Sequence, residues 1–159
     1  DNKKLYSSKV YGYTQKQKML KLKNTSWSYN LFVDELSRNG FKSSVRIIKD
    51  IIDWGNNNNM QISYSKNTIE GKLYFQKYDV KLLTITTGNT IDFRFDTYEE
   101  KLKITNVELE NHKANLQKIF NDDISFTKIY AQISNFEKYL KDEKVRLNFL
   151  NEILNIADS

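Results

Sequence analysis

Two short motifs near the middle of the chain carry the residue types that hold catalytic metal ions in restriction-type nucleases. Those enzymes place an Asp on one strand and an Asp/Glu-x-Lys pair on the next, so that carboxylates bind Mg²⁺ beside a lysine. Two matches and a possible upstream carboxylate occur: Glu70-Gly71-Lys72, Asp79-Val80-Lys81 and Asp53. Mg²⁺ needs oxygen ligands that converge in near-octahedral geometry, and this spacing shows no convergence. We favour exposed hairpin ion pairs and keep a restriction-like nuclease domain as the alternative.

The single histidine, His112, lies between Glu110 and Lys113 in a segment with helical spacing. Acid–base catalysis and metal binding require partner groups, and the chain has no second histidine and no cysteine. We therefore expect a histidine on a helix surface. There is no Ser in a nucleophile-elbow setting and no glycine-rich phosphate loop. The sequence thus predicts a protein that is not an enzyme, with no catalytic residue, metal site or cofactor.

All of the net positive charge belongs to residues 1–25. This basic N-terminal segment has seven lysines and one acidic residue, whereas residues 26–159 have 18 basic and 19 acidic side chains. Lysines among tyrosines could bind phosphates while the rings stack on bases. The same composition could instead dock on an acidic protein surface, or the lysines could protect an edge strand from aggregation. We rank the last two interpretations equally and nucleic acid third. The partner-binding candidates are Lys3, Lys4, Tyr6, Lys9, Tyr11, Tyr13, Lys16 and Lys18.

The pattern of apolar residues predicts two helices, over 27–39 and 45–54, with Ser26 and Ser44 as N-caps and Gly55 as the end of the second. A helix-turn-helix around Gly40 would offer polar residues to a DNA groove, namely Ser43, Ser44, Arg46 and Lys49. The second helix is rich in isoleucine, however, which suits burial better. Two consecutive core helices are the preferred interpretation.

Residues 60–96 alternate between apolar and polar side chains, which predicts about four antiparallel strands in a meander. Thr87-Gly88-Asn89 marks a hairpin, and a change of phase near Gly71 suggests a bulge. Helical spacing returns in the C-terminal third, where Asp142 is a candidate cap, while residues 124–140 remain unassigned. We therefore expect an α+β fold, with an antiparallel meander packed against N- and C-terminal helices and residues 26–159 forming a single domain.

The composition agrees with one folded domain. A chain of 159 residues can bury a real core, and its 10 Tyr, 9 Phe and 2 Trp bring large apolar areas to it. No apolar run approaches the ~18 residues of a membrane span, and the N-terminus lacks the apolar core of a signal peptide. Together with the lack of cysteine, these features predict a cytoplasmic protein of a bacterial host.

From DNKKLYSSKVYGYTQKQK through IIDWGNNNN to NFLNEILNIADS, the chain resembles type II anti-CRISPR proteins, which phages and mobile elements of low-GC bacteria encode. The resemblance implies a non-enzymatic inhibitor whose partner is a CRISPR effector nuclease with its guide RNA. Direct nucleic-acid contact would be secondary, and no membrane is involved. A net charge of +5 argues against mimicry of DNA phosphates. It fits better an inhibitor that traps the HNH nuclease domain in an inactive position, because HNH docking licenses cleavage. The alternative is a nucleic-acid-binding accessory protein.

Overall fold

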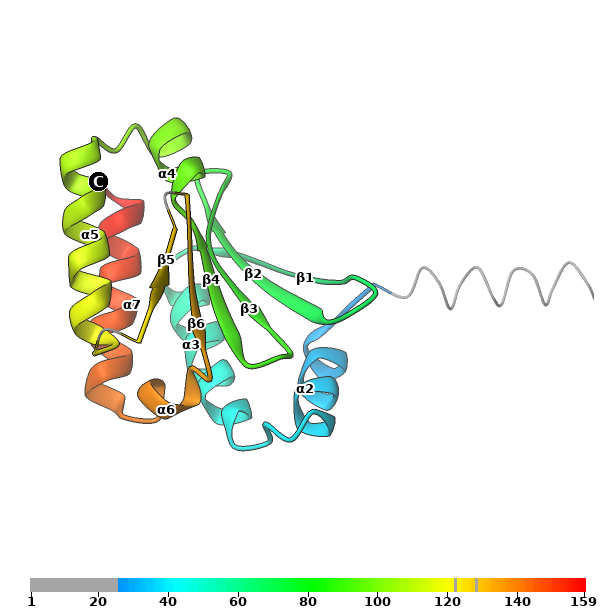
Figure 1. Cartoon of the computed structure of the whole chain (residues 1–159). Helices are drawn as coiled ribbons and strands as arrows, with labels where there is room; N and C mark the ends of the chain where they lie inside the picture. The colour runs from blue at the N-terminus through cyan, green and yellow to red at the C-terminus, as the bar shows by residue number, and fades with distance from the viewer. Residues whose placement is uncertain (1–25, 122, 128) are drawn as a thin grey trace, which may run out of the picture.

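A six-stranded antiparallel sheet organises the protein, whose structure is a computed structural model that describes residues 26–121, 123–127 and 129–159. The strands lie in the order β1-β2-β3-β4-β6-β5 (Figure 1). Their bounds are β1 (Gln61–Lys66), β2 (Gly71–Lys77), β3 (Val80–Thr86), β4 (Thr90–Arg94), β5 (Ser125–Phe126) and β6 (Tyr130–Ser134). The predicted α+β class is confirmed, and the meander corresponds to β1–β4. The two additional strands come from the segment that the sequence left unassigned.

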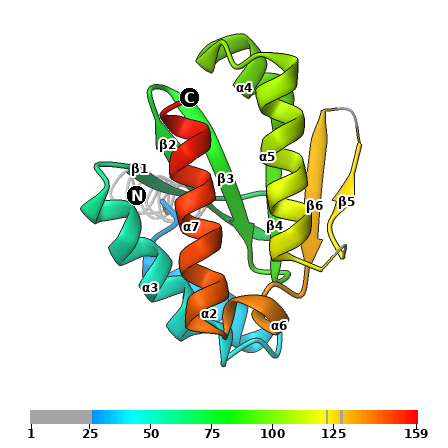
Figure 2. The ribbon, with the colours of Figure 1, turned by 90° about the vertical axis from the view of Figure 1, so that its left-hand side faces the viewer.

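Helices flank the meander in the chain and form a layer against it. Their bounds are α2 (Tyr29–Arg38), α3 (Ser44–Asn57), α4 (Phe95–Leu102), α5 (Asn106–Ile119), α6 (Glu137–Leu140) and α7 (Glu143–Ala157). Figure 2 looks onto this layer and shows α3, α7 and α5 in front of the strands. The close approach of Gly55 to Phe75 and the edge-to-face contact of Phe149 with Phe93 fix α3 and α7 against the sheet.

Alternation along the strands, interrupted by one bulge between β2 and β3, gives the sheet two different faces. Across four neighbouring strands, Leu73, Ile85, Ile91 and Ile133 lie opposite one another, and all four are fully buried beneath the helices. Phe93 and Phe149 join Phe120 in a run of edge-to-face aromatic contacts. This face forms the core, since both the sheet and the helices are apolar there.

Several predicted boundaries are wrong by one to three residues. The N-cap of α2 is Ser28 rather than Ser26, and that of α3 is Ser43 rather than Ser44. Gly55 does not end α3, because the helix continues through Asn57. Neither serine cap makes a side-chain hydrogen bond, so packing, which the local sequence does not reveal, decides where these helices begin.

Other local predictions are confirmed. Asp142 caps α7, since its carboxylate accepts the Val145 N–H at 3.0 Å. The hairpin between β3 and β4 turns at Gly88, and Asn89 there adopts φ +62°. The bulge, in contrast, lies between Phe75 and Gln76 rather than near Gly71. Gly71 is instead required for close packing, because a Cβ on it would come within 2.7 Å of the Trp27 ring.

Candidate functional site

The face of the sheet that points away from the helices is polar throughout. One residue from each of the six strands lies in a single row across it: Ser63, Tyr74, Thr84, Asp92, Gln132 and Ser125. No helix of the described part of the chain packs on this row, and its inner members are half-buried by their own neighbours. We call this surface the open sheet face. An antiparallel sheet with one solvated face commonly shows such a division.

Tyr74 is held in place on the open sheet face from both sides. Its hydroxyl is hydrogen-bonded to the Ser65 hydroxyl on β1 at 3.0 Å. From β3, the Lys81 ammonium lies 4.1 Å from the centre of its ring, which is a cation–π contact. A tyrosine with fixed torsions loses little conformational entropy on binding, so Tyr74 is a pre-ordered contact residue.

A second fixed tyrosine, Tyr130, lies on β6. Its hydroxyl donates to the Asp92 carboxylate at 2.8 Å, and the Gln132 amide donates to the same oxygen at 2.9 Å. Partial burial of the phenol raises the pKa of Tyr130, and the hydrogen bond to Asp92 and its charge raise it further. The hydroxyl therefore stays protonated at neutral pH and continues to donate to Asp92. The open sheet face thus offers rings, hydroxyls and amides in fixed positions, suited to binding rather than to proton transfer.

The candidate nuclease motifs do not form one site. Glu70 and Lys72 lie where β2 begins, with a separation of 4.0 Å between Glu70 Oε1 and Lys72 Nζ. Asp79 lies in the turn that follows β2, and the seven residues of this strand, about 20 Å of extended chain, lie between Glu70 and that turn. Asp53 belongs to α3, in the helical layer. Within the described ranges, no three His, Cys, Asp or Glu side chains gather as a metal site would require.

The prediction of a surface histidine is wrong. The side chain of His112 is only 12% exposed, and its Nδ1 lies 2.7 Å from Glu152 Oε1 on α7. Its Nε2 lies 3.0 Å from Ser159 Oγ. The amide of Asn115 donates to both oxygens of Glu152 at 3.3 Å. The helical spacing of α5 correctly indicated a helix, but it could not show that α7 packs against the flank on which His112 lies.

The order Ser159–His112–Glu152 has the connectivity of a hydrolase triad. That function also requires hydrogen-bond donors aimed at a developing oxyanion and room for a substrate. The Ser159 hydroxyl donates to the Asn155 carbonyl at 2.5 Å. The cluster joins Glu152 of α7, and Ser159 just after that helix, to His112 of α5, and we assign it to the packing of the two helices.

A second buried carboxylate ties α2 to the sheet. Glu35 accepts hydrogen bonds from the Lys66 ammonium at 2.7 Å, the Thr87 hydroxyl at 3.0 Å and the Gly71 N–H at 3.3 Å. Burial would raise the pKa of Glu35, but the hydrogen bonds from Lys66 and Thr87 outweigh it and lower the pKa below 4.5. The ionised carboxylate therefore joins α2 to β1, to β2 and to the turn after β3, which is a structural role.

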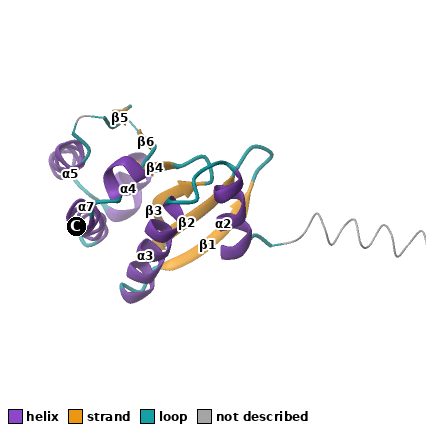
Figure 3. Ribbon diagram, turned by 90° about the horizontal axis from the view of Figure 1, so that it is seen from below, coloured by secondary structure: helices purple, strands orange, loops and turns teal. Residues whose placement is uncertain are grey.

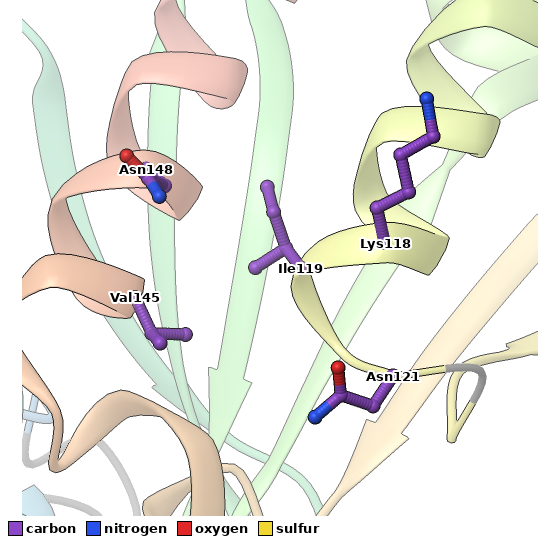
Figure 4. A pocket seen from close by; sticks show the side chains of 5 residues that line it. All are labelled: Lys118, Ile119, Asn121, Val145 and Asn148. Atoms are coloured by element: carbon purple, nitrogen blue, oxygen red, sulfur yellow. The ribbon is translucent and has the colours of Figure 1, made fainter.

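An open groove of about 290 Å³ lies between the end of α5 and the start of α7 (Figure 4). Ile119 and Val145 give it apolar walls, and its polar lining comes from Lys118, Asn121 and Asn148. Ligand pockets for small molecules usually exceed about 300 Å³ and enclose their ligand. This groove therefore suits one side chain of a macromolecular partner better than a cofactor.

The eight partner-binding residues predicted from the sequence, from Lys3 to Lys18, all lie outside the described residues. Their role stays a prediction. The open sheet face was missed by the sequence analysis, although the alternation from which the strands were predicted already separates its polar residues from the core. What the alternation could not show is that every described helix packs on the same face.

Comparison with known proteins identifies no relative of this chain. The chain matches no protein-family model, no curated protein and no solved structure. None of the helices in the described part of the chain is long and apolar enough to cross a membrane.

Proposed function

We propose that this protein is a non-enzymatic inhibitor that binds a type II CRISPR effector nuclease and blocks target cleavage by trapping the HNH domain in an inactive position. The resemblance of the sequence to type II anti-CRISPR proteins supplies the partner. One structural observation supports a binding role, namely an open sheet face that presents two fixed tyrosines across six strands. Tyrosine is enriched at protein interfaces because its ring offers apolar area and its hydroxyl offers a hydrogen bond.

The balance of charge argues against DNA mimicry. On the open sheet face Lys72 is close to Glu70, and Lys81 lies over Tyr74. Asp92, the carboxylate of the central row, is already bonded by Tyr130 and Gln132. This face does not present the dense negative charge that would imitate phosphates. A neutral surface with ordered aromatic residues fits recognition of a folded protein surface.

The decisive experiment separates target binding from target cleavage on one preassembled effector complex. Increasing amounts of the protein should abolish cutting while gel shifts still show bound target DNA, because HNH docking follows formation of the heteroduplex. Parallel loss of binding and cleavage would contradict HNH trapping and support blockade of the DNA channel. Full cleavage by cognate nucleases from several low-GC hosts would overturn the proposed function.

A matched pair of variants tests the open sheet face. Tyr74→Ala should weaken binding to the complex by about tenfold, the effect of losing about 1.4 kcal/mol at an interface. Tyr78→Ala is the control, because Tyr78 also has a lysine near its ring, Lys77 at 5.2 Å, but lies in the β2–β3 turn. Equal affinities for the two variants would place the interface elsewhere.

A further inference from the structure

The two edges of the sheet are built differently. At one edge β5 has only two residues, whereas at the other β1 has six. Proteins usually protect a long edge strand with proline, a bulge or charged side chains. β1 has no proline and regular pairing with β2 throughout. Its one charged residue, Lys66, stands at the end of the strand and is paired with Glu35 at 2.7 Å. Among the residues that the structure describes, β1 is therefore a long edge strand without the usual protection.

The hydrogen-bond pattern shows which backbone groups of β1 point outward. Beside the β1–β2 turn, the Asn67 N–H donates to the Glu70 carbonyl at 3.1 Å. In an antiparallel ladder, hydrogen-bonded and non-hydrogen-bonded pairs alternate. Ser65 and Ser63 are consequently bonded to β2, while the N–H and C=O groups of Ile62 and Tyr64 point away from it. In the described part of the chain, β1 is the outermost strand of the sheet and pairs only with β2; Figure 3 shows it beneath α2 and α3.

The side chains that border the edge are only partly covered. Ile62 packs against the end of α3, where it would meet a Cβ on Gly55 at 3.2 Å. Tyr64 packs against Phe32 of α2, with the ring centres 6.3 Å apart. Both side chains lie on the helical side of the sheet and remain partly exposed. A strand added beside β1 would gain backbone hydrogen bonds and would also cover this apolar border.

We infer that β1 pairs with β1 of a second copy of this chain, antiparallel and about a two-fold axis, so that the two sheets become continuous. An isologous contact of this kind uses the same strand on both copies and closes on itself. In the register that we propose, Ser63 faces Ser63 of the second copy, and Ile62 faces Tyr64 of the second copy. The outward N–H and C=O groups of Ile62 in each copy then pair with those of Tyr64 in the other copy, so this hydrogen-bonded pair forms once on each side of the two-fold axis.

This register is preferred over its neighbour for two reasons. It sets a β-branched side chain opposite an aromatic one, which is a favourable cross-strand pair. In the neighbouring register, Tyr64 would lie opposite Tyr64 of the second copy, and Lys66 would then lie opposite Ile62 of the second copy. A lysine engaged by Glu35 at 2.7 Å would then lie beside an apolar side chain and lose hydration. The proposed register sets no like charges opposite each other.

Sedimentation equilibrium of the protein alone tests this inference without any nuclease. The protein should shift from monomer to dimer as its concentration rises. Ser63→Lys sets two lysines directly opposite each other and should raise the dimer dissociation constant by about tenfold or more. Ser125→Lys is the matched control, because Ser125 lies in the same polar row on the opposite edge strand; it should leave dimerisation unchanged.

Hydrogen exchange provides a second, independent readout. The amides of Ile62 and Tyr64 should become protected as the dimer forms, whereas those in the turn after β2 should not change. A monomer at every concentration would overturn the inference, and so would a dimer that Ser63→Lys leaves intact. Protection of both amides in a monomer would show that another segment of the chain covers β1, which equally contradicts pairing between copies.

Discussion

The imidazole of His112 and the carboxylate of Glu152 meet at 2.7 Å between α5 and α7, and both side chains are almost completely buried. Removing one member of such a pair leaves the other buried without its partner, which costs more than the pair itself contributes. The contact between His112 and Glu152 should therefore be sensitive to substitution of either residue.

His112→Ala should lower the free energy of unfolding by about 3 kcal/mol, because Glu152 would keep only the two 3.3 Å bonds from Asn115. Urea denaturation followed by circular dichroism measures the effect. Glu110→Ala is the control on the same helix, since its ion pair with Lys113 is 70% exposed on the Glu110 side and should contribute less than about 0.5 kcal/mol. Equal effects of the two changes would contradict the structural role of His112.

Glu35 should make the free energy of unfolding depend on pH under acidic conditions. Its pKa in the folded protein lies below 4.5, so the unfolded chain binds more protons in this range. The contribution of Glu35 is therefore complete above pH 4.5 and is lost as the pH falls through the lower folded pKa. The difference in unfolding free energy between the wild type and Glu35→Gln should shrink with falling pH. Glu99→Gln, at an exposed position of α4, controls for total charge; a constant difference for Glu35→Gln would exclude this role.

Gly71→Ala should destabilise the protein by about 1–3 kcal/mol, because the new Cβ would lie 2.7 Å from Trp27 Cζ3 and 3.0 Å from Thr87 Cγ2. Thermal unfolding measures the loss. The same change in a Trp27→Ala background should cost less, since the ring that clashes is gone. Strict additivity of the two substitutions would show that the contact with Trp27 is not the cause.

Serine at Lys3, Lys4, Lys9, Lys16 and Lys18 should weaken binding to the effector complex while changing the melting temperature little. The reason is that the net positive charge of the chain is concentrated in residues 1–25. The loss should be larger at low salt, because salt screens exposed charges. If the melting temperature falls sharply instead, these lysines support the fold, and the interface lies elsewhere.

The protein should not cleave plasmid or single-stranded DNA in the presence of Mg²⁺ or Mn²⁺. Glu70 and Asp79 lie near opposite ends of β2, so the two motifs cannot bind the same ion. Agarose gels after prolonged incubation check this. Cleavage that disappears in Glu70→Ala or Asp79→Ala would overturn the proposal that the protein is not an enzyme.

The sequence by itself determined most of the local structure. Alternation over residues 60–96 was sufficient to predict β1–β4, because only one face of each strand meets the core. The apolar spacing around Ile48 and Ile51 predicted a buried helix, and both residues are fully buried in α3. Asp142 was identifiable as a cap because a carboxylate at that position can accept a backbone N–H without help from distant residues.

Only the tertiary structure decided which polar residues meet. Glu152 follows His112 by 40 positions, and Lys66 follows Glu35 by 31, distances at which a local pattern carries no information. β5 and β6 were also missed by the sequence analysis. β5 is too short to alternate, and β6 pairs with β4 across the whole of α4 and α5. The open sheet face exists because every described helix packs on the other side of the sheet. That arrangement depends on how the apolar faces of all the helices and strands are buried together in the folded chain.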